Sequence, residues 1–307
     1  MMQQNISTLS EGQRIVQKTI VYDSFTAGRG ERETTIINIV NQKGGCGKTT
    51  TSINLAALLA TKGFKVVLID TDPQAQTGLG LGVQVKEGQR SLYEVLVEGA
   101  ELGRALYPTE IPRLEIVPGS SLLSGAQLDL ASFYEREYIL KRSIESFLKS
   151  NACDYIIIDC SPTLNLITIN ALVAAKYALI PFQTHYYSLE GIKELLYTID
   201  LIKMKFNQPI EILGILATLF DRRSKIFHHV LNEVRGYFKD KVFDTVIHNC
   251  VKLCEAPMVH KPIHVYAPKS SGAEDYKNLT EEVIKRTKPS LALLPIAPVF
   301  HWQTLSS

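Results

Sequence analysis

Residues 42–49 combine the residue types that bind a nucleotide phosphate. The run reads Gln-Lys-Gly-Gly-Cys-Gly-Lys-Thr and follows the apolar stretch 36–40. Its glycines let the backbone curve so that N–H groups point at one anion, and a helix predicted to begin near Lys48 adds the positive end of its dipole. Lys48 can then reach the β- and γ-phosphates, and the Thr49 hydroxyl can bind Mg²⁺. The pattern therefore predicts a phosphate-binding loop.

The loop departs from the general phosphate-loop pattern G-x-x-x-x-G-K-[ST] at its first position. Gln42 stands where that pattern has glycine, and Lys43 adds a second cation beside it. The remaining glycines still allow the curvature that an anion site needs. The residues that we expect around the phosphates are Lys43, Gly44, Gly45, Cys46, Gly47, Lys48, Thr49 and Thr50.

Three aspartates follow apolar runs that indicate buried strands. An ionised Asp159 is costly in that position unless a cation lies near it, so we predict that Thr49 and Asp159 bind Mg²⁺, Asp159 directly or through a water molecule. Asp70 and Asp72 follow residues 66–69, where either could simply form a turn. Because the carboxyl ends of parallel strands converge on a ligand crevice, both are also candidates for the same site.

The elements that must position these residues alternate along the chain. Strand-like and helix-like runs follow one another from about residue 35, which is typical of an α/β fold with a doubly wound, mostly parallel sheet and helices on both faces. We predict strands at 36–40, 66–69, 114–117, 155–158, 178–182, 212–219 and 242–247. We predict helices from about 48 to 63 and at 133–149, 188–206, 225–238 and 273–287.

The bulk composition indicates a folded, soluble, intracellular protein. Of its 307 residues, 45% are hydrophobic and 21% are charged, which are ordinary values for globular domains. No stretch approaches the roughly 20 apolar residues of a membrane span, and the N-terminus holds no signal-peptide run. The formal net charge of +2 is too small to indicate a nucleic-acid partner, which would need a local basic patch.

The five cysteines do not form the even, closely spaced framework of a disulfide-rich protein. Cys250 and Cys254 have a spacing that could suit a metal, but no second Cys or His pair accompanies them. Cys153 and Cys160 bracket the predicted strand at 155–158, and we interpret them as core thiols rather than as iron–sulfur ligands. We therefore expect reduced cysteines.

Several ordered segments resemble the ParA/Soj partition ATPases, which belong to the deviant-Walker-A class that also includes MinD. The resemblance begins with residues 41–51, 70–74 and 154–159. It continues through 186–191, 245–247, 255–257 and 271–273. Because it covers roughly residues 34–288, we predict that this range is a ParA-like ATPase domain of the P-loop type.

Two extensions flank the predicted domain. Residues 1–33 are too few for a separate DNA-reading domain, and we expect them to be partly flexible. Residues 289–307 contain Pro289, Pro295 and Pro298, which forbid a continuous amphipathic helix. We expect their apolar side chains to dock on the domain, with a partner or dimer surface as the alternative.

The resemblance assigns roles to single residues. Lys43 resembles the signature lysine, which in the family crosses an ATP-sandwiched dimer to touch the partner's phosphates. Asp72 resembles the residue that positions the attacking water, and Asp159 the magnesium-site carboxylate. Together with Lys48, Lys43 and Asp72 form the predicted catalytic set.

DNA contacts are implied in the same way. Arg223 matches a DNA-binding arginine of the family, and Arg222, Lys225 and Lys252 extend the predicted patch. Further candidates are Lys203, Lys205, Lys269, Lys285 and Arg286. Outside residues 222–225, the alternative for each is an ordinary solvated side chain.

The chain departs from the family pattern in two segments. Ser161-Pro162 stands where two prolines are common, and residues 248–252 read His-Asn-Cys-Val-Lys where Pro-Arg-Asn-Val-Arg is common. In relatives the second segment contributes to adenine contacts and to a DNA-binding arginine. The resemblance therefore implies adenine recognition and this part of the DNA surface less directly here.

The resemblance implies a slow ATPase for plasmid or chromosome partition. It would form an ATP-sandwich homodimer, bind double-stranded DNA non-specifically and leave DNA when a ParB-like centromere-binding protein stimulates hydrolysis. Its place would be the cytoplasm, on the nucleoid. The alternatives are an ATPase that positions a protein cargo along the nucleoid and a MinD-like membrane-associated ATPase. The prolines of the tail, and the lack of any basic residue after Lys288, disfavour the membrane role.

Overall fold

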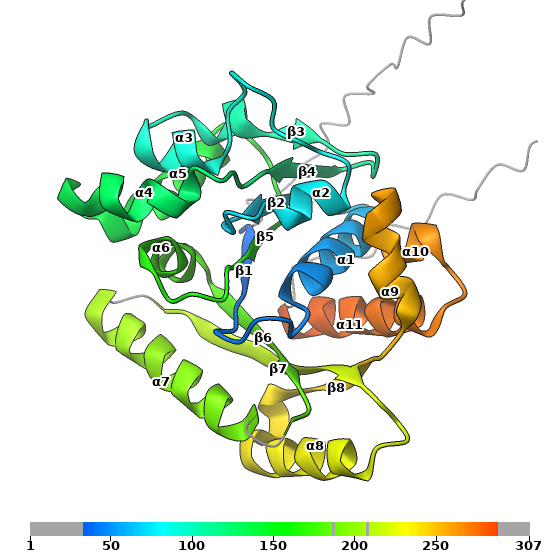
Figure 1. Cartoon of the computed structure of the whole chain (residues 1–307). Coiled ribbons are helices and arrows are strands. Elements are labelled where there is room, and N and C mark those ends of the chain that lie inside the picture. The colour runs from blue at the N-terminus through cyan, green and yellow to red at the C-terminus, as the bar shows by residue number, and fades with distance from the viewer. Residues whose placement is uncertain (1–32, 186–187, 207–208, 288–307) are drawn as a thin grey trace, which may run out of the picture. The chain divides into compact units, whose positions relative to one another are not determined.

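A computed structural model describes residues 33–185, 188–206 and 209–287 (Figure 1). Within these residues eight strands form one sheet, in the order β3-β4-β2-β5-β1-β6-β7-β8. Every neighbouring pair is parallel except β3 and β4, which are antiparallel. The doubly wound, mostly parallel sheet predicted from the sequence is confirmed.

Each predicted strand is present, with ends that differ from the prediction by at most one residue. The strands are β1 (Thr35–Ile39), β2 (Val66–Asp70), β3 (Tyr107–Pro108), β4 (Leu114–Val117), β5 (Tyr155–Asp159), β6 (Tyr177–Gln183), β7 (Glu211–Phe220) and β8 (Val242–His248). The helices are α1 (Lys48–Thr61), α2 (Gln76–Gly80), α3 (Leu92–Val97), α4 (Leu123–Asp129), α5 (Ile139–Leu148), α6 (Leu166–Ala174), α7 (Ser188–Phe206), α8 (Lys225–Phe238), α9 (Val251–Glu255), α10 (Ile263–Tyr266) and α11 (Ser271–Thr287).

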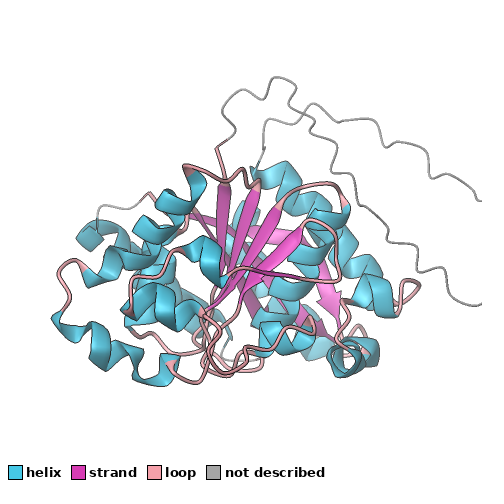
Figure 2. Cartoon of the chain, turned by 90° about the horizontal axis from the view of Figure 1, so that it is seen from above, coloured by secondary structure: helices cyan, strands magenta, loops and turns pink. Residues whose placement is uncertain are grey.

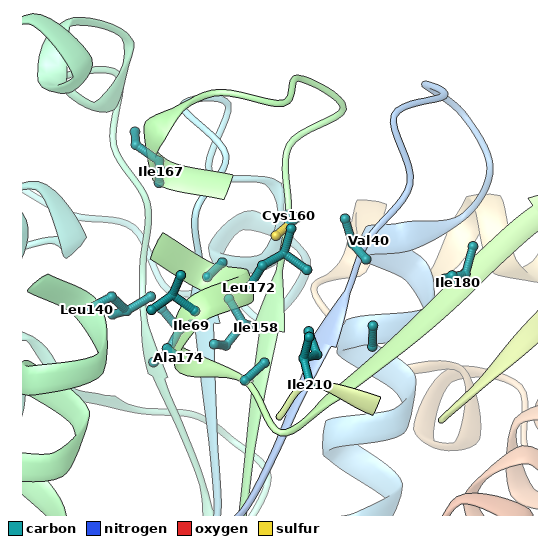
Figure 3. Close-up of a cluster of buried hydrophobic side chains, with 14 of the residues drawn as sticks. Val40, Ile69, Leu140, Ile158, Cys160, Ile167, Leu172, Ala174, Ile180 and Ile210 are labelled. Atoms are coloured by element: carbon teal, nitrogen blue, oxygen red, sulfur yellow. The ribbon is translucent and has the colours of Figure 1, made fainter. Parts of the chain in front are cut away.

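β5 shows why the sheet needs helices on both faces. Tyr155 and Ile157 enter one apolar cluster with side chains of α1 and α11, whereas Ile156 and Ile158 enter another with α5, α6 and α7. All four side chains are fully buried, as expected for a parallel strand that is covered on both sides. Figure 2 shows the two helix layers, and Figure 3 shows part of the second cluster around Ile158.

One helix prediction needed correction, and six helices were not predicted: α2, α3, α4, α6, α9 and α10. The predicted helix 133–149 begins only at Ile139, because Glu135 has a φ of 48° in the left-handed region, which ends any regular helix. Helix α6 is the longest of the helices that were not predicted. Its start is nevertheless marked by Asn165, whose Oδ1 accepts hydrogen bonds from the N–H groups of Ile167 and Thr168 at 3.0 Å each, a standard N-cap.

The cysteines are all free. Cys153 and Cys160 are 8% and 1% exposed, which confirms them as core thiols. Among the described residues, His, Cys, Asp and Glu side chains form no group of three or more that could hold a metal ion. In the same residues no helix has the length and apolar character needed to cross a bilayer. The predicted extensions, and the docking of 289–307, lie outside the described residues, apart from Glu33.

Candidate nucleotide site

The loop between β1 and α1 follows the carboxyl end of β1 and therefore lies at the carboxyl edge of the sheet. β1 is a central strand, which pairs with β5 on one side and β6 on the other. Gly45 and Gly47 have φ values of 73° and 82°, a backbone conformation that side chains with a Cβ disfavour. No side chain caps α1, and its first turn holds no acidic residue. Its free N–H groups and positive dipole end are therefore available to an anion.

The two lysines of the loop have opposite surroundings. Lys48 is 7% exposed, and its ammonium donates a hydrogen bond to the backbone carbonyl of Lys43 at 3.0 Å. The Lys43 side chain is exposed, and no described residue offers its ammonium an acceptor. Its backbone N–H donates to Asn41 Oδ1 at 2.9 Å. Thr50 lies half-buried in the first turn of α1.

Thr49 and Asp159 meet at the start of α1. Thr49 Oγ1 donates to Asp159 Oδ2 at 2.8 Å, and Ser52 Oγ lies 2.7 Å from Asp159 Oδ1. Asp159 is 1% exposed; burial raises its pKa, and the neighbouring carboxylate of Asp70 raises it further. A divalent cation beside this pair would favour the ionised carboxylate. A hydroxyl and a carboxylate are also the oxygen ligands that Mg²⁺ prefers, alongside water and phosphate, so the residues fit a magnesium ion.

Asp70 and Asp72, at the end of β2, differ in burial and in the hydrogen bonds that they accept. Asp70 is fully buried, and its Oδ1 accepts from Asp72 N–H at 2.9 Å while Oδ2 accepts from Thr77 N–H at 3.1 Å. Burial raises the Asp70 pKa. Asp70 therefore acts as a turn former. Asp72 is half-buried, and its Oδ1 accepts from Gln74 N–H at 2.9 Å. In the described structure no hydrogen bond or ion pair joins Asp72 to residues 42–49, so its catalytic role stays a prediction.

Three residues that contact this site were missed from the sequence: Ser52, Gln183 and Thr218. Gln183 Nε2 donates to the carbonyl of Gly45, and Thr218 Oγ1 to that of Cys46, both at 2.8 Å. Gln183 directly follows one predicted strand and Thr218 lies near the end of another, so the convergence of strand ends was a signal that could have found them.

Comparisons with known proteins agree with this geometry. Residues 34–212 match the family described as AAA domain. The chromosome partitioning protein ParA of Myxococcus xanthus is 45% identical over 274 residues, which cover 88% of this chain and 96% of that protein. The sporulation initiation inhibitor protein Soj of Bacillus subtilis is 45% identical over 248 residues, 81% of this chain and 97% of that protein. The chain belongs to the ParA/Soj family of partition ATPases.

A solved structure extends the likeness from sequence to fold. Cobyrinic acid a,c-diamide synthase from Mycobacterium smegmatis, with a bound ATP analogue and magnesium, superposes with a TM-score of 0.73 at 30% identity. The match covers 84% of this chain and 98% of that one. The P-loop NTPase fold that the ParA/Soj resemblance predicted is therefore confirmed.

Three of the four basic residues predicted for DNA follow the carboxyl end of β7, and the fourth, Lys252, lies in α9. Arg222, Arg223 and Lys225 are exposed where β7 leads into α8. The Arg223 guanidinium lies 3.1 Å from both carboxylate oxygens of Asp221, yet its side chain stays 90% exposed. Exposed Lys252 pairs with Glu255 at 2.7 Å. All four cations are thus accessible to solvent.

The segment that departs from the ParA/Soj pattern lies beside this loop. Asn249 N–H donates to Phe220 O at 3.0 Å, and Arg222 Nη2 lies 3.5 Å from His248 Nδ1. His248 N–H donates to Asp275 Oδ2 at 2.9 Å. The proline common in relatives has no N–H group and could not make this contact.

One further candidate for DNA contact is corrected. Arg286 is half-buried and donates to the carbonyls of Leu213 and Val242 at 2.9 and 2.8 Å, and to Glu282 at 2.8 Å. These contacts use its guanidinium inside the junction of α11 with β7 and β8, so Arg286 has a structural role.

Proposed function

We propose that this chain is an ATP-dependent partition ATPase that forms an ATP-sandwich homodimer and binds double-stranded DNA without sequence preference. The single observation that carries the proposal is the opposed placement of Lys48 and Lys43. Lys48 is buried and points into its own loop, whereas Lys43 is exposed and has no acceptor among the described residues. A second cation on the rim of a phosphate loop suits a phosphate held by another subunit.

ATP and Mg²⁺ would be held by the loop and by the Thr49–Asp159 pair. The N–H groups of the loop and Lys48 would bind the phosphates, and the magnesium ion would neutralise part of their charge. To reach a phosphate, Lys48 must exchange the Lys43 carbonyl for phosphate oxygens. Thr49 and Asp159 would hold the cation, and Ser52 keeps the carboxylate oriented through its 2.7 Å contact.

Hydrolysis would depend on Asp72 and on Lys43 of the second subunit. Asp72 would orient the attacking water and accept its proton, a role that needs a carboxylate at a loop able to move towards the phosphates. Lys43 would stabilise the charge of the transferring phosphoryl group from across the dimer. The free subunit therefore lacks one catalytic cation, which would make its turnover slow until a second subunit binds.

The DNA-bound state would use Arg222, Arg223, Lys225 and Lys252. Solvated cations such as these bind phosphates of any sequence and release counterions, so affinity falls with salt. A dimer would present two copies of the patch and gain avidity. We further propose that a ParB-like partner stimulates hydrolysis, and that the protein works in the cytoplasm on the nucleoid.

Co-sedimentation with arbitrary duplex DNA tests the proposal. The purified full chain is mixed with DNA in ATP and Mg²⁺, in ADP and Mg²⁺, and without nucleotide. We expect pelleting with DNA in ATP, little in ADP or without nucleotide, and a steep loss as salt rises. Equal pelleting in all three conditions, or binding that is indifferent to salt, would contradict the nucleotide switch and the phosphate contacts respectively.

A further inference from the structure

Two side chains from neighbouring strand ends hold the backbone of the phosphate loop from outside. Gln183 and Thr218 are register partners at the end of the β6–β7 pair. Gln183 Nε2 donates to Gly45 O and Thr218 Oγ1 to Cys46 O, each at 2.8 Å. The Thr218 hydroxyl also lies 3.0 Å from Phe182 O, and its single hydrogen favours the shorter contact to Cys46 O. They therefore bind two consecutive carbonyl groups of the loop.

The orientation of the Gln183 side-chain amide follows from the group that it contacts in the loop. The Gly45 carbonyl can only accept, so the nitrogen of the Gln183 amide must face it. The amide oxygen then faces His185 Nε2 at 2.8 Å, and this nitrogen must carry a proton. His185 thus holds the Gln183 amide in the orientation that donates to the loop.

The consequence lies on the other side of each peptide plane. In a planar trans peptide the C=O and the following N–H point in opposite directions. A carbonyl of Gly45 that is held towards Gln183 turns the N–H of Cys46 the opposite way, and the Cys46 carbonyl held by Thr218 does the same for the N–H of Gly47. Both N–H groups are thereby turned away from β6 and β7.

Packing holds the two planes to different degrees, because Cys46 is fully buried whereas the space around Gly44 and Gly45 is open. No heavy atom lies within 4 Å of the place where a Cβ would stand on Gly44 or Gly45, so side chains do not confine this part of the loop. Glycine also rotates more freely than other residues. At the Gly45–Cys46 peptide the hydrogen bond from Gln183 therefore supplies a constraint that packing around Gly45 does not, and at the Cys46–Gly47 peptide the bond from Thr218 adds to the burial of Cys46.

We propose that Gln183 and Thr218 are positioning residues that aim the N–H groups of Cys46 and Gly47 at a bound phosphate. The inference rests on the proposed function, because the phosphate is that of ATP. It adds two residues outside the loop motif to the residues on which nucleotide affinity depends.

Hydroxyl deletion at Thr218 gives the sharpest test, because Thr218→Val keeps the shape of the side chain and Thr218→Ser keeps the donor. Thr184→Val is the matched control, since Thr184 is 1% exposed and its hydroxyl has no partner among the described residues. Gln183→Met removes the second donor at similar length. Circular dichroism and the thermal unfolding midpoint establish that each variant is folded.

Affinity for ATP and ADP with Mg²⁺ is the first readout. We expect Thr218→Val and Gln183→Met each to weaken binding roughly 10-fold, the loss that corresponds to one charge-assisted hydrogen bond. Thr218→Ser and Thr184→Val should bind like the wild type. Wild-type affinity in Thr218→Val would overturn the proposal, because the hydroxyl would then not matter for binding. An equal loss of affinity in Thr218→Ser would overturn it in favour of a packing role for the methyl group.

The backbone amide signals of ligand-free protein are the second readout, and they do not depend on nucleotide binding. Thr218→Val should shift the Gly47 amide resonance and Gln183→Met that of Cys46, whereas Thr184→Val should shift neither. A wild-type chain without affinity for ATP would overturn the proposed function. Unmoved Gly47 and Cys46 resonances in the two donor-free variants would overturn the positioning role itself.

Discussion

The ammonium of Lys48 donates to the main-chain carbonyl of Lys43, 3.0 Å away, so the acceptor belongs to the backbone and not to the Lys43 side chain. The contact therefore survives when the Lys43 side chain is changed. Because Lys48 is 7% exposed and Lys43 is exposed at the rim of the loop, their contributions should separate in experiments on single variants.

Lys43→Ala should lose dimerisation far more than ATP binding. The exposed ammonium is absent, but the loop and Lys48 remain, so ATP affinity should change little while the ATP-dependent dimer weakens on the order of 10-fold or more, the loss of one charge-assisted contact. Lys48→Ala should instead lose ATP binding or the productive dimer. Sedimentation velocity with ATP and Mg²⁺ measures the dimer, and nucleotide titration measures affinity. A Lys43→Ala chain that dimerises like the wild type would contradict the trans role.

Asp72→Ala should bind ATP and dimerise but hydrolyse poorly. The carboxylate has no bond to the phosphate loop in the described structure, so nucleotide binding does not depend on it. Loss of a group that orients and deprotonates water lowers turnover roughly 10²-fold or more. Phosphate release is measured with and without DNA, and Asp200→Ala on the exposed face of α7 is the control. Unchanged turnover in Asp72→Ala would refute the assignment.

Gly119→Ala tests the same loop by steric means. A Cβ at this position would lie 2.5 Å from Asp72 O and 3.2 Å from Asp70 O, both backbone atoms that cannot move aside easily. We expect a loss of stability of about 1–3 kcal/mol, measured by urea unfolding, together with slower ATP hydrolysis. Gly191→Ala is the control, because nothing lies within 4 Å of its added Cβ. Wild-type stability in Gly119→Ala would show that the loop can shift without cost.

The strands could be predicted because each carries an apolar run that the parallel sheet buries on both faces. The apolar run before Asp159 was predicted as such a strand, and its boundary is correct to one residue. Helix boundaries depended on single residues instead. The left-handed backbone of Glu135 prevents the predicted helix from beginning at residue 133. A glutamate in the sequence does not indicate that conformation in advance.

The phosphate loop could be predicted because its residues are consecutive in the sequence. Gln183 and Thr218 were not, since their role depends on contacts across 138 and 172 positions that only the sheet order creates. Asp70 illustrates the opposite case. Its position suggested a catalytic carboxylate as readily as a turn former, and only the bonds to Asp72 and Thr77 distinguish the two.

Arg223→Ala should weaken DNA binding without affecting ATP affinity. Arg223 is 90% exposed, and Asp221 keeps its guanidinium oriented. Loss of one phosphate contact reduces the slope of log affinity against log salt by about 1. Binding is measured by fluorescence anisotropy with duplexes of unrelated sequence, in ATP, over about 50–200 mM salt. Arg104→Ala is the matched control, since Arg104 is also exposed beside a local carboxylate, Glu101. An equal effect of both variants would reduce Arg223 to a general charge contribution.

Glu282→Gln should destabilise the fold at neutral pH and much less in acid. Glu282 accepts from the N–H groups of Asp244 and Thr245 at 3.0 Å each and from Arg286 at 2.8 Å. Burial opposes its ionisation, but these hydrogen bonds outweigh burial and lower its pKa. The stabilisation is therefore complete above the unfolded pKa of about 4.3 and is lost as pH falls through the lower folded value.

An amide at position 282 cannot accept with both of its polar atoms, so one backbone N–H would lose its partner at neutral pH. We expect Glu282→Gln to cost about 1–3 kcal/mol near pH 7, with a clearly smaller difference from the wild type near pH 3.5, measured by urea unfolding at both values. Glu281→Gln is the matched control, because its exposed side chain should change stability by less than about 0.5 kcal/mol. An identical loss at both pH values would show that the charge of Glu282 is not what joins α11 to β8.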